Sequence, residues 1–221
     1  MKRNERTTTS HAVWRAVQSL QVLLLLLAGG CGSGEKEVIW KEKVDLADGS
    51  AIQIDRYVRF HWQRSFGIGG GSTGEGERES RLTIDVAAES LPVWSGPLIP
   101  ALLDRDPVNH EFVLVATSES CEYWNAHGEP DPPYWTFRLH GGQWKATDIP
   151  ESFYGRRPNL FFNYNAEDGG RLATDDVESR KRSQIRHATV EHLRTIIRRS
   201  RDFGCTHSYK PPAKAVEGES R

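Results

Sequence analysis

The sequence predicts an α+β fold: a single antiparallel, β-rich domain with one long C-terminal helix packed on the sheet. Segments in which apolar and polar residues alternate recur through residues 38–147, and this period of two is typical of half-buried strands. Asp48-Gly49 and Gly141-Gly142 each separate two such segments, and both dipeptides favour tight hairpin turns. From about Asp175 to Phe203 the apolar residues instead recur at helical spacing, which predicts the helix.

The clearest strands are expected at residues 38–44, 51–62, 81–86, 111–116, 134–140 and 143–147. Residues 91–94 are expected to form an edge or broken strand, because Pro92 has no N–H to donate to a ladder. Residues 97–103 fit either a strand or a buried loop, and residues 118–125 are expected to form one helical turn.

The predicted C-terminal helix has recognisable ends and a candidate core face. Asp175 and Glu178 have the spacing of a capping box at its start, and Gly204 is a suitable stop. We expect the apolar stripe of this helix to be buried against the sheet. The stripe consists of Ile185, Ala188, Leu193, Ile196 and Ile197.

Residues 1–30 have the three parts of a secretory signal peptide. A basic region holds Lys2, Arg3, Arg6 and Arg15, and an apolar run follows from Leu20 to Leu27. The run is much shorter than the roughly 20 residues that a membrane-spanning helix needs. It therefore predicts export of the chain.

The end of this segment, Ala28-Gly29-Gly30-Cys31, resembles the lipobox of bacterial lipoproteins. The resemblance implies cleavage before Cys31 and attachment of a diacylglycerol, a palmitate-type anchor, to its thiol. Ala28 stands where the lipobox usually has Leu. The alternative is an ordinary signal peptide cut near Ala28-Gly29, which leaves Cys31 as a free thiol.

The expected organisation is a lipoprotein signal peptide (1–30), a tether (31–37), a single α+β domain (38–210) and a disordered tail (211–221). Gly32 follows the expected lipid site, and in lipoproteins of this type the absence of Asp there resembles the outer-membrane sorting pattern. We therefore expect a lipid-anchored protein of the cell envelope, on the outer membrane and facing the periplasm.

The net charge excludes a general attraction to nucleic acid. The chain has 29 basic and 30 acidic residues, and removing the signal peptide's four basic residues and one acidic residue leaves 25 against 29, a net charge of −4. Basic residues gather on the predicted helix: Arg180, Lys181, Arg182, Arg186, Arg194, Arg198, Arg199 and Arg201. They fit a face that binds an envelope protein or anionic headgroups, or a solvated outer face, which the sequence favours.

No catalytic, metal or cofactor site is predicted. Gly69, Gly71 and Gly74 match a dinucleotide-binding spacing, but a highly charged segment follows where an apolar helix should pack, so residues 66–80 are expected to form a mobile surface loop. Cys121 and His127 lack the spacing of a nucleophile and its base. The histidines are dispersed and show no metal-ligand spacing.

A disulfide between Cys121 and Cys205 is expected. Once Cys31 carries lipid, these two are the remaining cysteines, and an exported protein lies in an oxidising compartment. The alternative is two separate buried thiols, or a Cys121 that stays reactive.

Four groups of motifs resemble a family of uncharacterised lipoproteins of Gram-negative bacteria. They are Trp40-Lys41-Glu42-Lys43-Val44 with Asp48-Gly49; Pro132-Pro133-Tyr134 with Phe137-Arg138; Gly142-x-Trp144; and Arg157-Pro158-Asn159-Leu160. These are aromatic and turn residues, and the family has no assigned activity. The resemblance implies a lipoprotein and no particular mechanism.

The expected function is therefore a binding or assembly role at the envelope membrane. An immunity-type inhibitor that blocks a toxin there is one form of this role. The competing hypothesis is a periplasmic, hydrolase-like enzyme with an unrecognised site. A deep cleft that gathers acid and base groups would favour the enzyme, and a flat aromatic or basic patch would favour the binding protein.

Overall fold

The computed structural model describes residues 33–63, 75–86, 89–118, 121–164, 168–188 and 191–199. By its internal contacts the chain divides into two units, Met1–Gly34 with Trp62–Gly74, and Glu35–His61 with Glu75–Arg221. Nearly all the described residues belong to the second unit, and every contact discussed below lies within it. The predicted signal peptide and the predicted tail lie outside the described residues.

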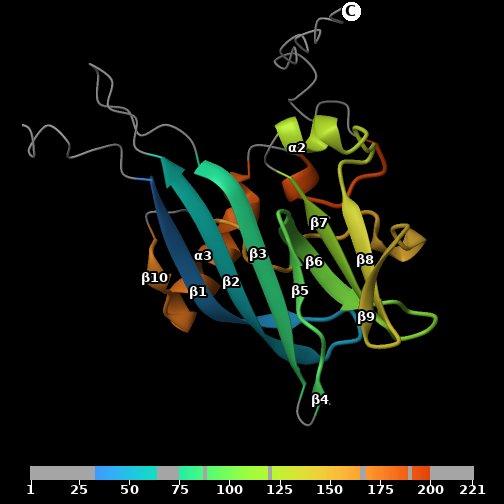
Figure 1. Ribbon diagram of the computed structural model, residues 1–221. Helices are drawn as coiled ribbons and strands as arrows, with labels where there is room; N and C mark the ends of the chain where they lie inside the picture. The colour runs from blue at the N-terminus through green and yellow to red at the C-terminus, as the bar shows by residue number, and fades with distance from the viewer. Residues whose placement is uncertain are drawn as a thin grey trace, which may run out of the picture. The chain divides into compact units, whose positions relative to one another are not determined.

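Two β-sheets make up most of the described residues (Figure 1). The large sheet has the strand order β10-β1-β2-β3-β4, with β5 also paired to β3. Its strands are β1 (Ser33–Asp45), β2 (Ala51–Gln63), β3 (Glu75–Val86), β4 (Glu89–Ser90), β5 (Trp94–Gly96) and β10 (Gly170–Arg171). The small, antiparallel sheet has the order β6-β7-β8-β9. Its strands are β6 (Ile99–Arg105), β7 (Phe112–Thr117), β8 (Trp135–His140) and β9 (Gln143–Thr147).

The prediction of an α+β fold with one long C-terminal helix is wrong. Within the described residues the fold is mainly β-sheet, and the longest helix is α3 (Thr174–His187). The others are α2 (Cys121–Ala126) and two single 3-10 turns, η1 (Glu151–Phe153) and η2 (Glu191–Leu193). The helical periodicity therefore extended well beyond the helix that the chain forms.

Beyond the end of α3, the described backbone makes hydrogen bonds to distant parts of the chain. Ala188 closes α3 by donating its N–H to Gln184 O at 2.8 Å, and its ψ of 122° leaves the helical region. Further on, the N–H of Ile196 donates to Arg156 O, and Ile196 O accepts the N–H of Gly155, both at 2.8 Å. Tertiary contacts thus override the helical periodicity at Ile196, because local helix signals are only a weak guide to the final structure.

The predicted apolar stripe does not form one helical face. Of its members beyond α3, Ile196 is buried and Leu193 and Ile197 are half-buried. Ile196 packs against the small sheet, in a cluster with Tyr134 and Phe153. The predicted capping box is also wrong, because Ala173 is the N-cap and no side chain caps the helix.

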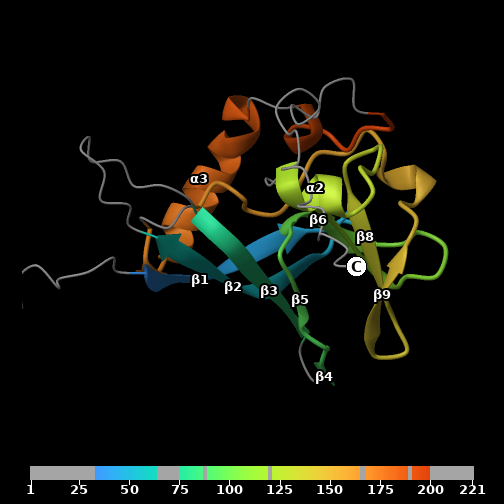
Figure 2. The same ribbon diagram turned by 45° about the horizontal axis from the view of Figure 1, so that its top comes forward.

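Four apolar clusters occur among the described residues, and the three largest hold this unit together. The first joins the two sheets, with Val44, Ile54 and Leu82 from the large sheet and Leu103 and Leu114 from the small one. The second lies between the large sheet and α3, which covers the β1–β2 part of that sheet (Figure 2). It contains Trp40, Phe60, Phe161, Tyr164 and Val177 among others. The third lies on the other face of the small sheet.

Most strand predictions agree with the structure at their centres. The expected hairpin is formed by β8 and β9, joined by Gly141 and Gly142 with φ of 59° and 73°, left-handed values that glycine adopts without steric cost. Residues 97–103, left open by the sequence, contribute most of β6. Two predictions need correction: residues 75–80, expected in the surface loop, belong to β3, and β1 already begins at Ser33, inside the expected tether.

Candidate functional site: an aromatic strip beside the small sheet

The predicted lipid site and the predicted disulfide are not tested by the structure. Cys31 and Cys205 lie outside the described residues, and Cys121 is the first residue of α2, where it is half-buried. The pairing of Cys121 with Cys205 therefore stays a prediction. Within the described residues, no helix is both long enough and apolar enough to cross a bilayer.

His127 is held by α2 itself. Its Nδ1 lies 2.7 Å from Tyr123 O, and its ring stacks on the Tyr123 ring with the two centroids 3.8 Å apart. Because a backbone carbonyl only accepts, Nδ1 carries the hydrogen in this contact. The imidazole thus serves as part of an aromatic stack, and its contacts give no sign of activating Cys121.

The basic residues predicted to share one helix are dispersed. Arg180 contacts Asp168 at 2.9 Å, and Arg198 pairs with Glu151. Arg194 donates from Nε to Ala188 O at 2.6 Å. Arg182 and Arg186 are exposed on α3, so the described basic surface of that helix is smaller than the sequence indicated.

Lys181 on α3 and two charged residues of the large sheet form a group between the helix and the sheet. Glu42 on β1 and Arg56 on β2 are fully buried, with Arg56 Nη1 lying 3.2 Å from Glu42 Oε1. Lys181 Nζ lies 3.5 Å from Glu42 Oε2, which also accepts the Phe161 N–H at 2.9 Å. Burial raises the pKa of Glu42, and the two cations and the Phe161 N–H oppose that rise.

This buried group has a structural role. The Arg56 guanidinium lies over the Trp40 ring, 5.0 Å from its centroid. The side chains of Glu42 and Arg56 have no exposed surface, so no external substrate reaches them. On the face of the large sheet they separate Trp40 and Val58 of the second cluster from Val44 and Ile54 of the first.

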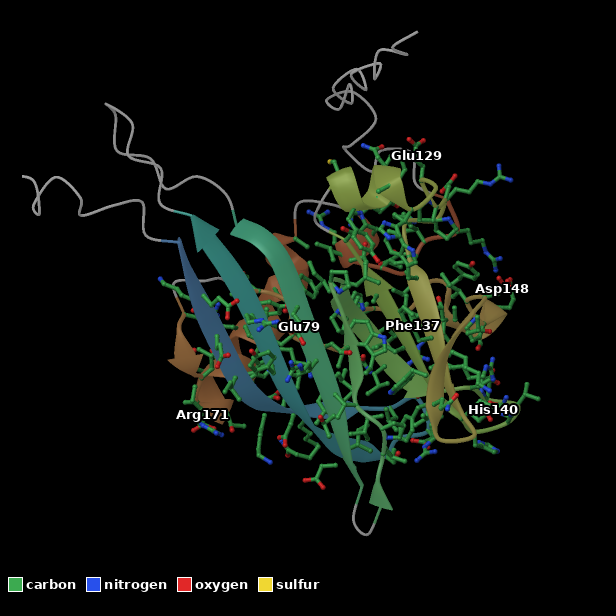
Figure 3. The ribbon with its side chains drawn as sticks, viewed as in Figure 1. Glu79, Glu129, Phe137, His140, Asp148 and Arg171 are labelled. Carbon is green, nitrogen blue, oxygen red and sulfur yellow. The ribbon has the colours of Figure 1, made fainter. Side chains whose placement is uncertain are left out.

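The surface feature that stands out is a row of half-buried apolar side chains, which we call the aromatic strip. It consists of Tyr123, Trp135, Phe137, Leu139 and Trp144. Trp135, Phe137 and Leu139 alternate along β8 and therefore share one face of the strand. Phe137 lies in the region between β5 and β8 (Figure 3). All five side chains pack on the cluster that joins the sheets.

Ring contacts and the strand register give the order of the side chains along the aromatic strip. The rings of Tyr123 and Trp135 meet edge-on, with centroids 5.4 Å apart. Trp144 on β9 lies opposite Leu139 in the hairpin register. Phe137, between these two pairs, contacts Trp94 of β5 at a centroid distance of 5.5 Å.

The aromatic strip is anchored before any partner arrives. Trp144 Nε1 donates to Pro92 O at 2.9 Å, and the Tyr123 ring is fixed between His127 and Trp135. Burial raises the pKa of Tyr123 above its ordinary value of 10.0. Rigid aromatic side chains offer contact area at a small entropic cost, and they are enriched at the energetic centres of interfaces.

Sequence reasoning placed four of these residues in strands and Tyr123 in a helical turn, but it missed the strip. The alternation of Trp135, Phe137 and Leu139 was visible in the sequence, and it indicated a common face without showing that the face stays half-exposed. Tyr123 and Trp144 come from other elements, and only the tertiary structure brings them to the same row.

Within the part of the chain that the structure describes, no group of three or more His, Cys, Asp or Glu side chains is arranged to hold a metal ion. Comparisons with known proteins add no assignment: no family model, no curated protein and no solved structure matches this chain.

Proposed function

We propose that this protein is a lipid-anchored lipoprotein of the cell envelope whose role is to bind a protein partner through the aromatic strip. The lipid anchor rests on the sequence from Ala28 to Cys31 and its resemblance to a lipobox. The binding role rests on one observation, the row of half-buried side chains from Tyr123 to Trp144 that all pack on the same core cluster. An inhibitor of a toxin, of the immunity type, is one form of this role.

The competing enzyme hypothesis draws little support from the described acid and base groups. Glu42 is sealed beneath α3 with its two cations. His192 is buried, and burial lowers its pKa to about 4, so the imidazole is neutral at physiological pH. Asp104 accepts the Ala47 N–H at 3.0 Å and pairs with Arg156. Each of these groups supports a structural contact, whereas a catalytic acid or base must reach a substrate.

The proposal is tested by photo-crosslinking in intact cells from two exposed valines. Val93 is 51% exposed and lies between Pro92, which accepts the Trp144 hydrogen bond, and Trp94, which contacts Phe137. Val108 is 87% exposed in the turn between β6 and β7 and serves as the matched control. A benzophenone side chain is placed at each position in turn in the full chain.

We expect a discrete crosslinked product from position 93 and none from position 108. Tyr123→Ser, which removes the end ring of the strip, should weaken the product from position 93 without changing the amount of protein in the membrane fraction. Equal products from both valines, or no product from position 93, would show that the strip is not a binding surface.

A further inference from the structure

Strand β9 ends the small sheet, and its outer side has no described neighbour. In both ribbon views no strand is drawn beyond it (Figures 1 and 2). It begins after the β8–β9 turn and ends just before Asp148. His140, which precedes the turn, and Asp148 are labelled in Figure 3. Among the described residues, no backbone hydrogen bond outside the hairpin involves residues 143–147.

The hairpin register shows which backbone groups of β9 point outward. His140 and Gln143 flank a two-residue turn, and Leu139 lies opposite Trp144. In such a hairpin the residues beside the turn exchange hydrogen bonds, and bonded and non-bonded pairs then alternate. Gln143, Lys145 and Thr147 therefore pair with β8. The N–H and C=O groups of Trp144 and Ala146 face away from the sheet.

Two other strand edges, those of β1 and β6, are closed by specific contacts. On β1, Lys43 donates its N–H to Glu178 Oε1 at 3.2 Å, and Lys43 O accepts from Lys181 Nζ at 2.6 Å. On β6, Ala101 O accepts the N–H groups of Asn159 and Leu160, each at 3.1 Å. Edges are commonly covered in this way because unpaired strand groups attract other strands. Against that background the open edge of β9 stands out.

We propose that the edge of β9 binds an extended segment of a partner protein, which adds as a further strand and places an acidic side chain opposite Lys145. This inference rests on the proposed binding role and adds that the bound segment is extended and acidic. Backbone hydrogen bonds with Trp144 and Ala146 supply affinity. Side chains of the added strand that lie on the same face of the sheet as the Trp144 ring also contact that ring. Such addition to a sheet edge needs no rearrangement of the β8–β9 hairpin.

Lys145 argues for an acidic partner and against a second copy of this chain. It is exposed, forms no ion pair with a described residue, and lies opposite Arg138, which contacts Asp106 at 2.6 Å. If two β9 strands paired antiparallel through Trp144 and Ala146, the two Lys145 side chains would lie directly opposite each other. Like charges in that position destabilise a sheet, whereas an opposite charge stabilises it.

The test uses two labelled synthetic peptides of alternating valine and threonine, one with a central glutamate and one with a central lysine. Amide hydrogen exchange is measured by NMR on the full chain. With the glutamate peptide we expect slower exchange at Trp144 and Ala146. Exchange at Lys145, whose N–H is already bonded to β8, should change little. Fluorescence anisotropy gives the affinities.

Two variants separate the edge from the strip. Ala146→Pro removes an outward N–H that β8 does not use, a position where an edge strand tolerates proline, and it should weaken peptide binding about tenfold. Ala146→Val keeps the N–H and should bind as the wild type does. Lys145→Glu should reverse the preference and favour the lysine peptide, which gives an answer even if the proline variant folds poorly.

The outcomes also separate this inference from the proposed function. Failure of both peptides to protect Trp144 and Ala146, or undiminished binding to a folded Ala146→Pro variant, would overturn the edge as a docking site. Protection that rises with protein concentration in the absence of peptide would identify a second copy as the occupant and overturn the proposed partner. In either case a crosslinked product from position 93 would leave the binding role of the strip standing.

Discussion

The side chain of Asn159 takes the place of a neighbouring strand for Leu103. The Leu103 N–H donates to Asn159 Oδ1, and Asn159 Nδ2 donates to Leu103 O, each at 2.9 Å. Nδ2 also donates to Asp45 O at 3.1 Å, at the end of β1. One amide therefore closes the edge of β6 and ties it to the large sheet.

This geometry predicts the effect of removing the amide. Asn159→Ala leaves the backbone groups of Leu103 without their partners, which should cost about 1–3 kcal/mol in the free energy of unfolding. Denaturant unfolding measures the loss. Asn163→Ala is the control, because the Asn163 side chain is exposed and its described hydrogen bonds use only its backbone. Equal effects of the two substitutions would contradict the role assigned to Asn159.

The buried pair beneath α3 should be much more sensitive than a surface pair on the same strands. Glu42→Gln leaves Arg56 with an uncompensated charge, and breaking a buried pair in this way typically costs about 3–5 kcal/mol. Lys41 and Asp55 form an exposed pair at 2.9 Å, and Lys41→Ala should cost about 1 kcal/mol or less. Chemical denaturation of both variants provides the comparison, and a stable Glu42→Gln variant would be incompatible with the buried ion pair.

His192 should make the protein less stable in mild acid. Burial lowers its pKa from 6.5 to about 4, so between these values the unfolded chain binds a proton that the folded chain does not. Stability therefore falls as the pH drops from 6.5 towards 4, by at most about 3 kcal/mol from this residue. His192→Gln should show a smaller fall in unfolding free energy over this range. Parallel stability curves for variant and wild type would refute the assignment.

The predicted disulfide can be checked by mass. Intact exported protein should lack two hydrogens under non-reducing conditions if Cys121 and Cys205 are joined. The bond would close a loop of about 85 residues and stabilise the fold by roughly 4 kcal/mol on the chain-entropy model, less any strain. Labelling of both thiols in exported protein would disprove the pairing and reopen the question of a reactive Cys121.

The lipid anchor predicts a change in processing. Cys31→Ser should yield an uncleaved precursor or a soluble exported protein, because the thiol that receives the lipid is absent. Membrane fractionation and electrophoretic mobility report this directly. A Cys31→Ser variant that fractionates and migrates as the wild type does would rule out lipidation at this residue.

Local sequence signals predicted the hairpins, whereas tertiary contacts determined the length of α3 and which of its side chains face the sheet. Gly141 and Gly142 specify the β8–β9 turn through their own backbone preferences. In contrast, the inward side of α3 includes Lys181 and Gln184, polar residues that an apolar periodicity leaves out. Their partners lie far away in the sequence: Lys181 reaches Glu42, and Gln184 Oε1 accepts the Phe162 N–H at 2.9 Å.

The same limit applies to the candidate site. The alternation in β8 predicted a common face for Trp135, Phe137 and Leu139, but exposure depends on what else packs there. Tyr123 from α2 contacts that row at its end, at Trp135, and Trp94 from β5 contacts it in the middle, at Phe137. Neither contact has a local signal in the sequence.

Besides covering the second cluster, α3 also covers part of the edge of β1, because Glu178 and Lys181 bond the backbone of Lys43. A helix that unfolds locally would expose these edge groups on β1, and an exposed strand edge templates pairing between chains. We therefore expect substitutions that loosen α3 to promote aggregation at temperatures where the two sheets are still folded. On this view, α3 protects the protein's solubility.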